Sequence, residues 1–189
     1  MSFLLSILFF VGLICSSLSF KVLLYNTGSS KSHIQFGGAL VNTLVDRGHV
    51  VDLLIMSWNP NVNSNGTYLA RNIYRINLNE ESPWTRMDHL VDSMRPQTVS
   101  FSHPIYEETR QEFCKTLLNQ SDFIERLKIE QYDVGISSLY DHCGLGLFYL
   151  LGIRSTMGFF PTPMMDWTGW ELGLPMAPSY ISDLLCDQT

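Results

Sequence analysis

A histidine stands between two runs of regular pattern. His33 follows an apolar run at 20–26, typical of a buried strand, and precedes a run at 36–45 with the spacing of one helix face. In parallel α/β sheets, ligands bind at the carboxyl ends of strands. Ser32 and Gln35 have capping-box spacing, which predicts Ser32 as N-cap and His33 as the first helical residue. The positive end of the helix disfavours an imidazolium, so we expect a neutral ring, as a general base requires.

The sequence lacks the motifs that would indicate a metal site or a dinucleotide site. The alternative for His33 is a surface histidine without a role. The remaining histidines, at 49, 89, 103 and 142, show no H-x-x-x-H or H-E-x-x-H spacing, so we expect no metal. The loop at 27–32 lacks the G-x-G-x-x-G of a dinucleotide site, so we expect no nicotinamide or flavin cofactor.

The elements that would position His33 form a repeated strand–helix–strand pattern. Predicted strands lie at 20–26, 50–56, 73–78, 132–138 and 153–160. Predicted helices lie at 36–45, 104–119, 121–131 and 144–151, with Ser121 as N-cap of the third. Alternation of this kind predicts an α/β fold, a single doubly wound parallel sheet of Rossmann type.

Composition and the amino-terminal residues limit the classes of function and the cellular location that the chain can have. The net charge of −6 and the absence of a basic run argue against nucleic-acid binding. Residues 3–15 form an apolar run of signal-peptide length, followed by small residues, so we predict a signal peptide at 1–19 and a mature domain at 20–189. An uncleaved anchor is the alternative, since the run has no preceding Lys or Arg.

Entry into the secretory pathway gives meaning to cysteines and sequons. Asn65 and Asn119 begin N-x-[ST] triplets, and Asn65 lies in a polar stretch that predicts an exposed loop, which makes it the better glycosylation candidate. Loss of the leader would leave Cys114, Cys143 and Cys186. This odd count permits at most one disulfide, and three half-buried thiols are the favoured expectation.

Several short motifs carry a resemblance. They are Ser32-His33, Arg47-Gly48-His49, Tyr132-Asp133-Val134, Pro163-Met-Met-Asp166, Leu172-Gly-Leu-Pro175 and Ala177-Pro-Ser-Tyr180. Together they resemble the amino-terminal half of UDP-glucuronosyltransferases, and the residues in these motifs are most like those of nematode members. The resemblance implies a GT-B fold in which this half binds a lipophilic acceptor. The other half would bind the UDP-sugar and carry a membrane anchor, so we expect a truncated chain that is inactive alone.

The resemblance also implies roles for residues. His33 matches the general base that deprotonates the acceptor hydroxyl as the sugar is transferred with inversion. An acidic residue would orient that ring, but the matching position is Ser138. Asp141 is the candidate substitute, although a helix N-cap is the alternative that we favour for it. Trp84, Met87 and Phe101, in a region that also holds Met94, are expected to line the acceptor pocket or to be ordinary core.

Two hypotheses of function follow. The first is a detoxifying UDP-glycosyltransferase of the endoplasmic reticulum, membrane-associated in its full-length form, with UDP-glucuronate as the expected co-substrate. The second is a non-catalytic lumenal protein that binds hydrophobic small molecules or full-length transferases, alone or as an oligomer. The acceptor and the sugar are not specified by these 189 residues.

Overall fold

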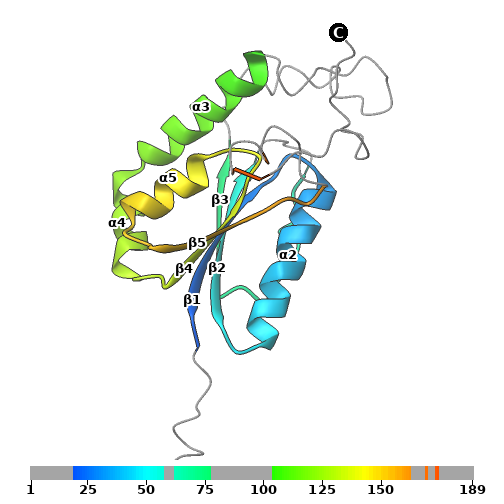
Figure 1. The fold of residues 1–189 in the computed structure, drawn as a ribbon, viewed down its shortest axis with the longest axis vertical. Helices are drawn as coiled ribbons and strands as arrows, with labels where there is room; N and C mark the ends of the chain where they lie inside the picture. The colour runs from blue at the N-terminus through cyan, green and yellow to red at the C-terminus, as the bar shows by residue number, and fades with distance from the viewer. Residues whose placement is uncertain (1–18, 58–61, 78–103, 163–168, 170–172, 175–189) are drawn as a thin grey trace, which may run out of the picture.

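The computed structural model describes residues 19–57, 62–77, 104–162, 169 and 173–174 (Figure 1). The strands within these ranges are β1 (Lys21–Thr27), β2 (Val50–Ser57), β3 (Asn72–Asn77), β4 (Val134–Ser138) and β5 (Ser155–Phe159). The labelled helices within them are α2 (Lys31–Asp46), α3 (Pro104–Leu118), α4 (Ser121–Ile129) and α5 (Cys143–Leu150). These bounds confirm each predicted element to within a few residues.

The strands form one parallel sheet in the order β3-β2-β1-β4-β5. The chain builds outwards from β1 to β3 and then returns to the other side of β1 with β4. The doubly wound fold predicted from the sequence is therefore confirmed. The topological switch point lies between β1 and β4, where such sheets bind ligands.

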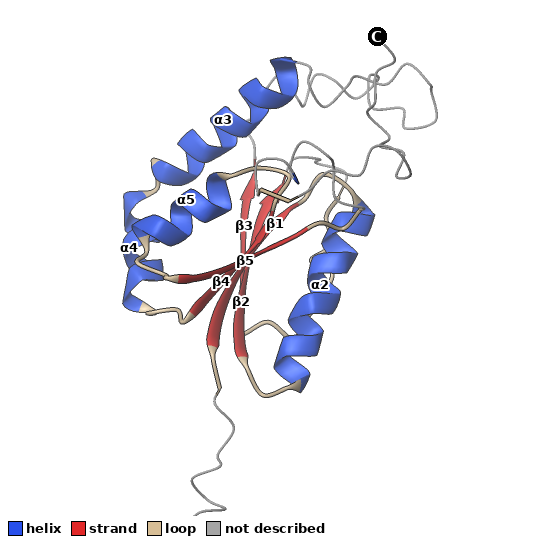
Figure 2. Cartoon of the chain, viewed as in Figure 1, coloured by secondary structure: helices blue, strands red, loops and turns tan. Residues whose placement is uncertain are grey.

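Helices cover both faces of the sheet (Figure 2). Helix α2 packs on one face through Ile34 and Val41, against Val22 and Leu24 of β1. Helices α3, α4 and α5 cover the other face, where their apolar side chains pack around Leu23 and Tyr25 of the same strand. Because β1 is buried on both faces, its sequence is a nearly continuous apolar run.

Two glycines let α2 approach its neighbours closely. A Cβ at Gly37 would lie 2.1 Å from Nδ2 of Asn26, and one at Gly38 would lie 2.2 Å from the carbonyl oxygen of Gly66. Gly66 itself has a φ of +72°, a conformation that favours glycine. The Gly-Gly pair inside the helix is therefore explained by packing against β1 and against the segment before β3.

An ionic network centred on one buried carboxylate joins the amino ends of the strands. The carboxylate of Asp52 is fully buried and accepts hydrogen bonds from Nε of Arg71 at 2.9 Å and from the Tyr132 hydroxyl at 2.6 Å. Arg71 also pairs with Glu130, which binds Nζ of Lys21 at 2.6 Å. Burial tends to raise the pKa of Asp52, but the bonds from Arg71 and Tyr132 outweigh burial and hold that pKa below its usual value.

A disulfide between Cys114 and Cys143 joins α3 to α5 across 29 residues. The expectation of three free thiols is therefore wrong, although the limit of one bridge holds for the described cysteines. Closure of a loop of this length stabilises a fold by about 3–4 kcal/mol. The predicted N-cap of α4 is also wrong, because Gln120 takes that position and Ser121 is the first helical residue.

The predicted leader lies outside the described residues, except for Ser19. Its hydroxyl donates to the carbonyl of Gly48 at 2.8 Å, a bond that cleavage after Ser19 would remove. Phe20, the first residue of the predicted mature chain, is held by its own backbone N–H, which donates to Nδ1 of His49 at 3.3 Å. Among the described helices, none has the length and hydrophobicity that crossing a membrane requires.

Candidate active site

His33 lies in the first turn of α2, directly after the carboxyl end of β1. Ser30 is the N-cap, with extended backbone angles, and its Oγ accepts from the backbone N–H of His33 at 3.4 Å. The predicted cap at Ser32 is wrong by two residues, so His33 is the third helical residue and Gln35 is exposed. Three serines within four positions offered alternative caps, and the local pattern alone did not distinguish among them.

The imidazole of His33 is half-buried between two loops. Its Nδ1 is in hydrogen-bonding contact with Oγ of Ser30, and Oγ of Ser32 lies farther away, at 3.5 Å. The Tyr140 ring packs against it at 4.7 Å between centroids and 55° between planes. Burial lowers the pKa of His33, which supports the predicted neutral ring by a physical cause other than the helix dipole.

Tyr140 brings the second loop to the site. It follows β4, the strand beside β1, so the carboxyl ends of the two strands place Tyr140 and His33 together. The Tyr140 hydroxyl bonds Oγ1 of Thr162 at 2.7 Å, and its ring packs edge-on against Phe160 at 5.9 Å. Tyr140 was not predicted as a site residue, although its place in a loop after a buried strand was a usable signal.

The structure does not bring Asp141 and His33 together. The buried carboxylate of Asp141 accepts from the Tyr25 hydroxyl at 2.9 and 3.0 Å and from the backbone N–H of Cys143 at 2.9 Å. These bonds hold the segment that leads into α5. The N-cap of α5 is His142, however, so the N-cap role favoured for Asp141 from the sequence is wrong by one residue. Burial raises the pKa of this carboxyl to about 6, with the bonds from Tyr25 and Cys143 opposing the rise. The geometry thus corrects the assignment of Asp141 as the partner of the ring.

Two further polar side chains lie at the carboxyl edge. Ser138, the position where the resemblance implies an acid, is buried and bonds Oγ1 of Thr27 at 3.1 Å. Asn26 is also buried, and its Nδ2 donates to the carbonyl of His33 at 3.2 Å. Asn26 therefore fixes the first turn of α2 from β1, a role that a polar residue ending an apolar strand could have suggested.

The sequons differ in accessibility. Oδ1 of Asn65 accepts from Arg75 at 3.0 Å, and the Thr67 hydroxyl is buried against the side chain of Asn42. The loop of Asn65 is therefore packed rather than fully exposed as predicted. Asn119 is exposed in the turn between α3 and α4, and Ser121 beside it is exposed too. Asn119 is therefore the more exposed of the two asparagines, whereas the sequence predicted an exposed loop at Asn65.

The remaining predicted residues do not enter the described site. Trp84, Met87, Met94 and Phe101 lie outside the described residues. In the part of the chain that the structure describes, no group of three His, Cys, Asp or Glu side chains could hold a metal.

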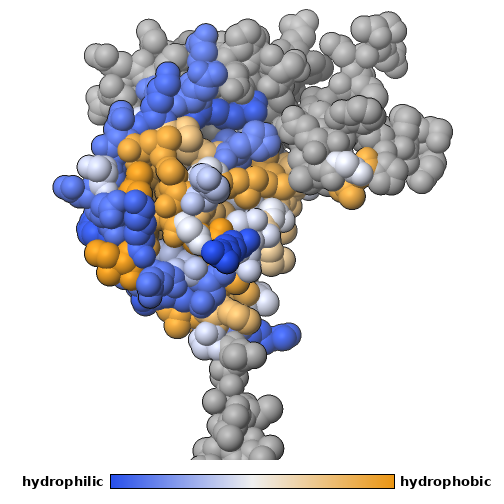
Figure 3. Space-filling view, turned by 60° about the vertical axis from the view of Figure 1, so that its left-hand side comes forward, coloured by the Kyte–Doolittle hydropathy of each residue, from blue (hydrophilic) through white to orange (hydrophobic). Residues whose placement is uncertain are grey.

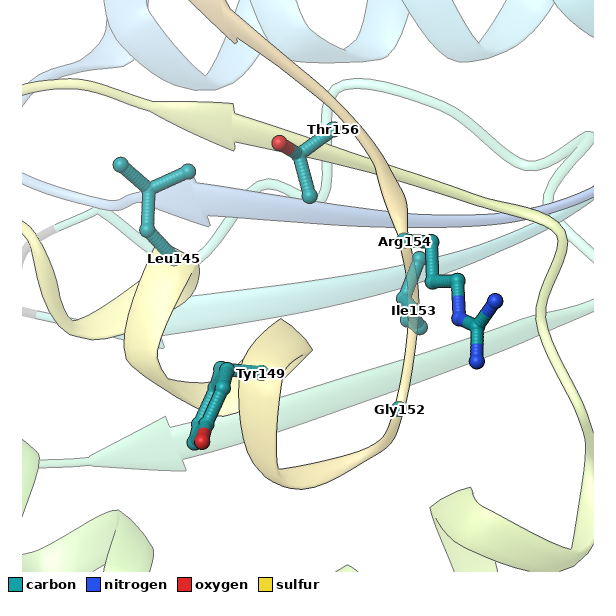
Figure 4. A pocket seen from close by; sticks show the side chains of 6 residues that line it. All are labelled: Leu145, Tyr149, Gly152, Ile153, Arg154 and Thr156. Carbon is teal, nitrogen blue, oxygen red and sulfur yellow. The ribbon is translucent and has the colours of Figure 1, made fainter.

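A shallow depression of about 520 Å³ lies elsewhere, between α5 and β5 (Figure 4). Its lining is Leu145, Tyr149, Gly152, Ile153, Arg154 and Thr156. Neither His33 nor Tyr140 contributes to it, so the depression is distinct from the candidate site.

Comparisons with known proteins agree with the resemblance. No family model matches the chain. It is 25% identical over 179 residues to the putative UDP-glucuronosyltransferase ugt-56 of Caenorhabditis elegans, covering 87% of this chain and 33% of that protein. It is 28% identical over 171 residues to the putative UDP-glucuronosyltransferase ugt-55 of the same organism, covering 83% and 32%. The predicted resemblance to UDP-glucuronosyltransferases is thus confirmed, and the chain spans about a third of the length of these relatives.

A solved structure supports the fold. The crystallised glycotransferase of kitacinnamycin superposes with a TM-score of 0.51 at 16% identity, covering 82% of this chain and 34% of that one. The described domain is therefore a Rossmann-like domain of the kind found in GT-B glycosyltransferases.

Proposed function

We propose that this chain is the acceptor-binding domain of a UDP-glycosyltransferase and that His33 is its general base. The observation that most supports this is the half-buried imidazole at the switch point, which packs against Tyr140 and whose pKa is lowered by burial. The names of the similar proteins support the transferase class. The wider activity is a proposal, because the chain corresponds to a third of those proteins.

The proposed reaction needs little from this domain besides position and one proton acceptor. A neutral ring nitrogen of His33 takes the proton of an acceptor hydroxyl. The hydroxyl oxygen bonds to the anomeric carbon with inversion, and the bond from that carbon to the UDP oxygen breaks, so UDP leaves with the electron pair. We propose a small lipophilic acceptor and UDP-glucuronate as donor, the latter bound by residues outside this chain. No resident cofactor takes part.

Replacement of His33 tests this proposal. In these 189 residues joined to a UDP-sugar-binding domain of a relative, His33→Ala should lower kcat by roughly 10²–10⁴-fold, the usual worth of a positioned base. Acceptor affinity, measured by calorimetry, should change little, because the ring acts on a proton. The matched control is His49→Ala, at a histidine before β2 whose Nδ1 accepts from the backbone of Phe20.

Full turnover in the His33→Ala enzyme would exclude His33 as the general base. Acceptor binding with no turnover in the completed wild-type enzyme would favour the non-catalytic binding protein. The 189 residues alone should show neither transfer nor a micromolar site for UDP-glucuronate by calorimetry.

We propose the lumen of the endoplasmic reticulum as the compartment, with membrane association in a longer form. The disulfide between Cys114 and Cys143 supports an oxidising environment. Expressed in eukaryotic cells, the chain should begin at Phe20 and lose mass on endoglycosidase treatment. Asn119→Gln should remove more of that shift than Asn65→Gln, because Asn119 is exposed. An unshifted mass with free thiols at 114 and 143 would contradict the proposal.

A further inference from the structure

Ser30 has more polar contacts around His33 than its capping role requires. Its Oγ contacts Nδ1 of the ring, lies 3.4 Å from the His33 backbone nitrogen and 2.9 Å from Oγ of Ser32. A hydroxyl has one proton to donate and two lone pairs that accept. The backbone N–H can only donate, so it occupies one lone pair. The proton and the second lone pair must then be divided between Nδ1 and Ser32.

Two arrangements satisfy this count. In one, Ser32 donates to Ser30, and Ser30 donates to an unprotonated Nδ1, which leaves the ring proton on Nε2. In the other, Ser30 donates to Ser32 and accepts from a protonated Nδ1, which leaves Nε2 with a free lone pair. Only the second arrangement has a basic nitrogen outside the Ser30 contact. It also keeps Nδ1–H paired when Nε2 takes a proton. In the first arrangement the added proton would have to go to Nδ1, where it would face the hydroxyl proton of Ser30.

We propose that Ser30 is a positioning residue that accepts the Nδ1 proton of His33 and so selects the tautomer with a basic Nε2. This inference rests on the proposed function for its purpose, but the tautomer itself is a property of the unliganded chain. Ser30 would thus supply the orienting bond that the resemblance assigns to an acid at position 138, where this chain has a serine bonded to Thr27. Unlike a carboxylate, Ser30 brings no charge to balance an imidazolium.

The contacts of the His33 ring allow its preferred tautomer to be measured. The described contacts of the ring are with Ser30, Ser32 and Tyr140, of which Tyr140 is the titratable one. Asp141 on the same loop as Tyr140 is engaged with Tyr25 and Cys143. A hydrogen bond of ordinary net strength favours one tautomer by roughly fivefold, which ring nitrogen spectra resolve.

The test is nitrogen NMR of the 189-residue chain with ¹⁵N-labelled histidine, at a pH where the ring is neutral. Wild type should show the Nδ1-protonated form in excess. Ser30→Thr keeps the hydroxyl and should preserve that form, whereas Ser30→Asp, which can only accept, should strengthen it and raise the pKa of the ring. Ser30→Gly keeps an accepted N-cap residue but removes Oγ, so its ring should be a mixture of both tautomers.

Ser29→Gly is the matched control, one position earlier, at a serine that makes no hydrogen bond to the ring in the described part of the chain. Its spectrum should equal that of wild type. An Nδ1 that is unprotonated in wild type but protonated in Ser30→Asp would show that the serine donates, and would overturn the proposal. A Ser30→Gly ring identical to wild type would overturn it too, and if that variant does not fold, the comparison with Ser30→Asp decides. These spectra need no substrate, so they stand apart from the outcome of His33→Ala.

Discussion

His33 and Asp141 lie at neighbouring strand ends, yet burial moves their proton affinities in opposite directions. Burial disfavours the charged form of each group, so it lowers the pKa of the imidazole and raises that of the carboxyl to about 6. The neutral form of each group is therefore favoured, which suits a proton acceptor at position 33. The same burial does not suit Asp141 as a counter-charge for an imidazolium.

Asp141→Asn separates the two roles considered for Asp141. The folded pKa of about 6 exceeds the usual value of 3.8, so the folded state binds more protons between these values. The wild type should therefore lose stability relative to Asp141→Asn as pH rises from about 4 to about 6, by about 3 kcal/mol in total. Urea unfolding at a series of pH values measures this difference.

Catalysis gives the second readout for the same variant. Asn can still accept from the backbone N–H of Cys143, so turnover of a completed enzyme should remain near that of wild type. A loss of about a hundredfold with an unchanged fold would return Asp141 to the role of orienting the ring. A stability difference that is constant across pH would instead refute the raised pKa.

At the scale of elements, the sequence predicts most of the fold because burial determines its pattern. β1 and β2 are buried on both faces and so read as apolar runs, while α2 shows one apolar face. What it could not predict depends on tertiary proximity. The disulfide requires that the packing of α3 and α5 brings together Cys114 and Cys143, two residues that are 29 positions apart in the chain.

The candidate site divides in the same way. His33 was predictable because its loop follows a strand and precedes a helix. Its contacts with Ser30 and Tyr140 were not, because one depends on which serine caps α2 and the other on the pairing of β1 with β4. The packing of the Asn65 loop escaped prediction for a related reason, since Arg75 of β3 holds it through three hydrogen bonds, to Val62, Ser64 and Asn65.

Glycine-to-alanine changes in two helices should have opposite signs. Gly38→Ala forces a Cβ against the backbone of Gly66, which cannot rotate away, and should destabilise the fold by about 1–3 kcal/mol. Gly146→Ala in α5 meets nothing within 4 Å and should stabilise it by about 0.5–1 kcal/mol through helix propensity. Thermal or urea unfolding of both variants checks the pair, and equal effects would show that α2 is not packed closely on this loop.

In the whole molecule, the amino ends and the carboxyl ends of the strands carry side chains of different chemistry. The amino ends are held by the network of Asp52, Arg71 and Glu130, which is ionic and structural. The carboxyl ends at β1 and β4 carry uncharged polar groups and the ring of His33. Within the part of the chain that the structure describes, the network of Asp52, Arg71 and Glu130 thus lies at the end of the sheet opposite the candidate site, where it stabilises the fold without supplying a counter-charge to the imidazole.

Figure 3 shows hydrophobic residues gathered on the side of the molecule that bears α5 and β5, with hydrophilic residues around them. Tyr149 and Leu150 of α5 are 85% and 47% exposed, and Met157 of β5 is 61% exposed. Helix α5 is apolar on all sides, a composition typical of helices buried all round. Among the described strands, β5 is an end of the sheet and no strand pairs with its outer side.

An exposed apolar edge strand is a template for pairing with another chain, so the isolated 189 residues should self-associate as concentration rises. Met157→Lys places a charge on this edge and should require roughly tenfold more protein for the same degree of association. Ile129→Lys is the matched control, because Ile129 is also exposed, at 79%, but lies at the end of α4 rather than on the edge strand. Sedimentation velocity over a concentration series measures the association. Equal effects of the two lysines would indicate general solubility rather than edge pairing, and a wild-type chain that stays monomeric throughout would remove the edge from consideration.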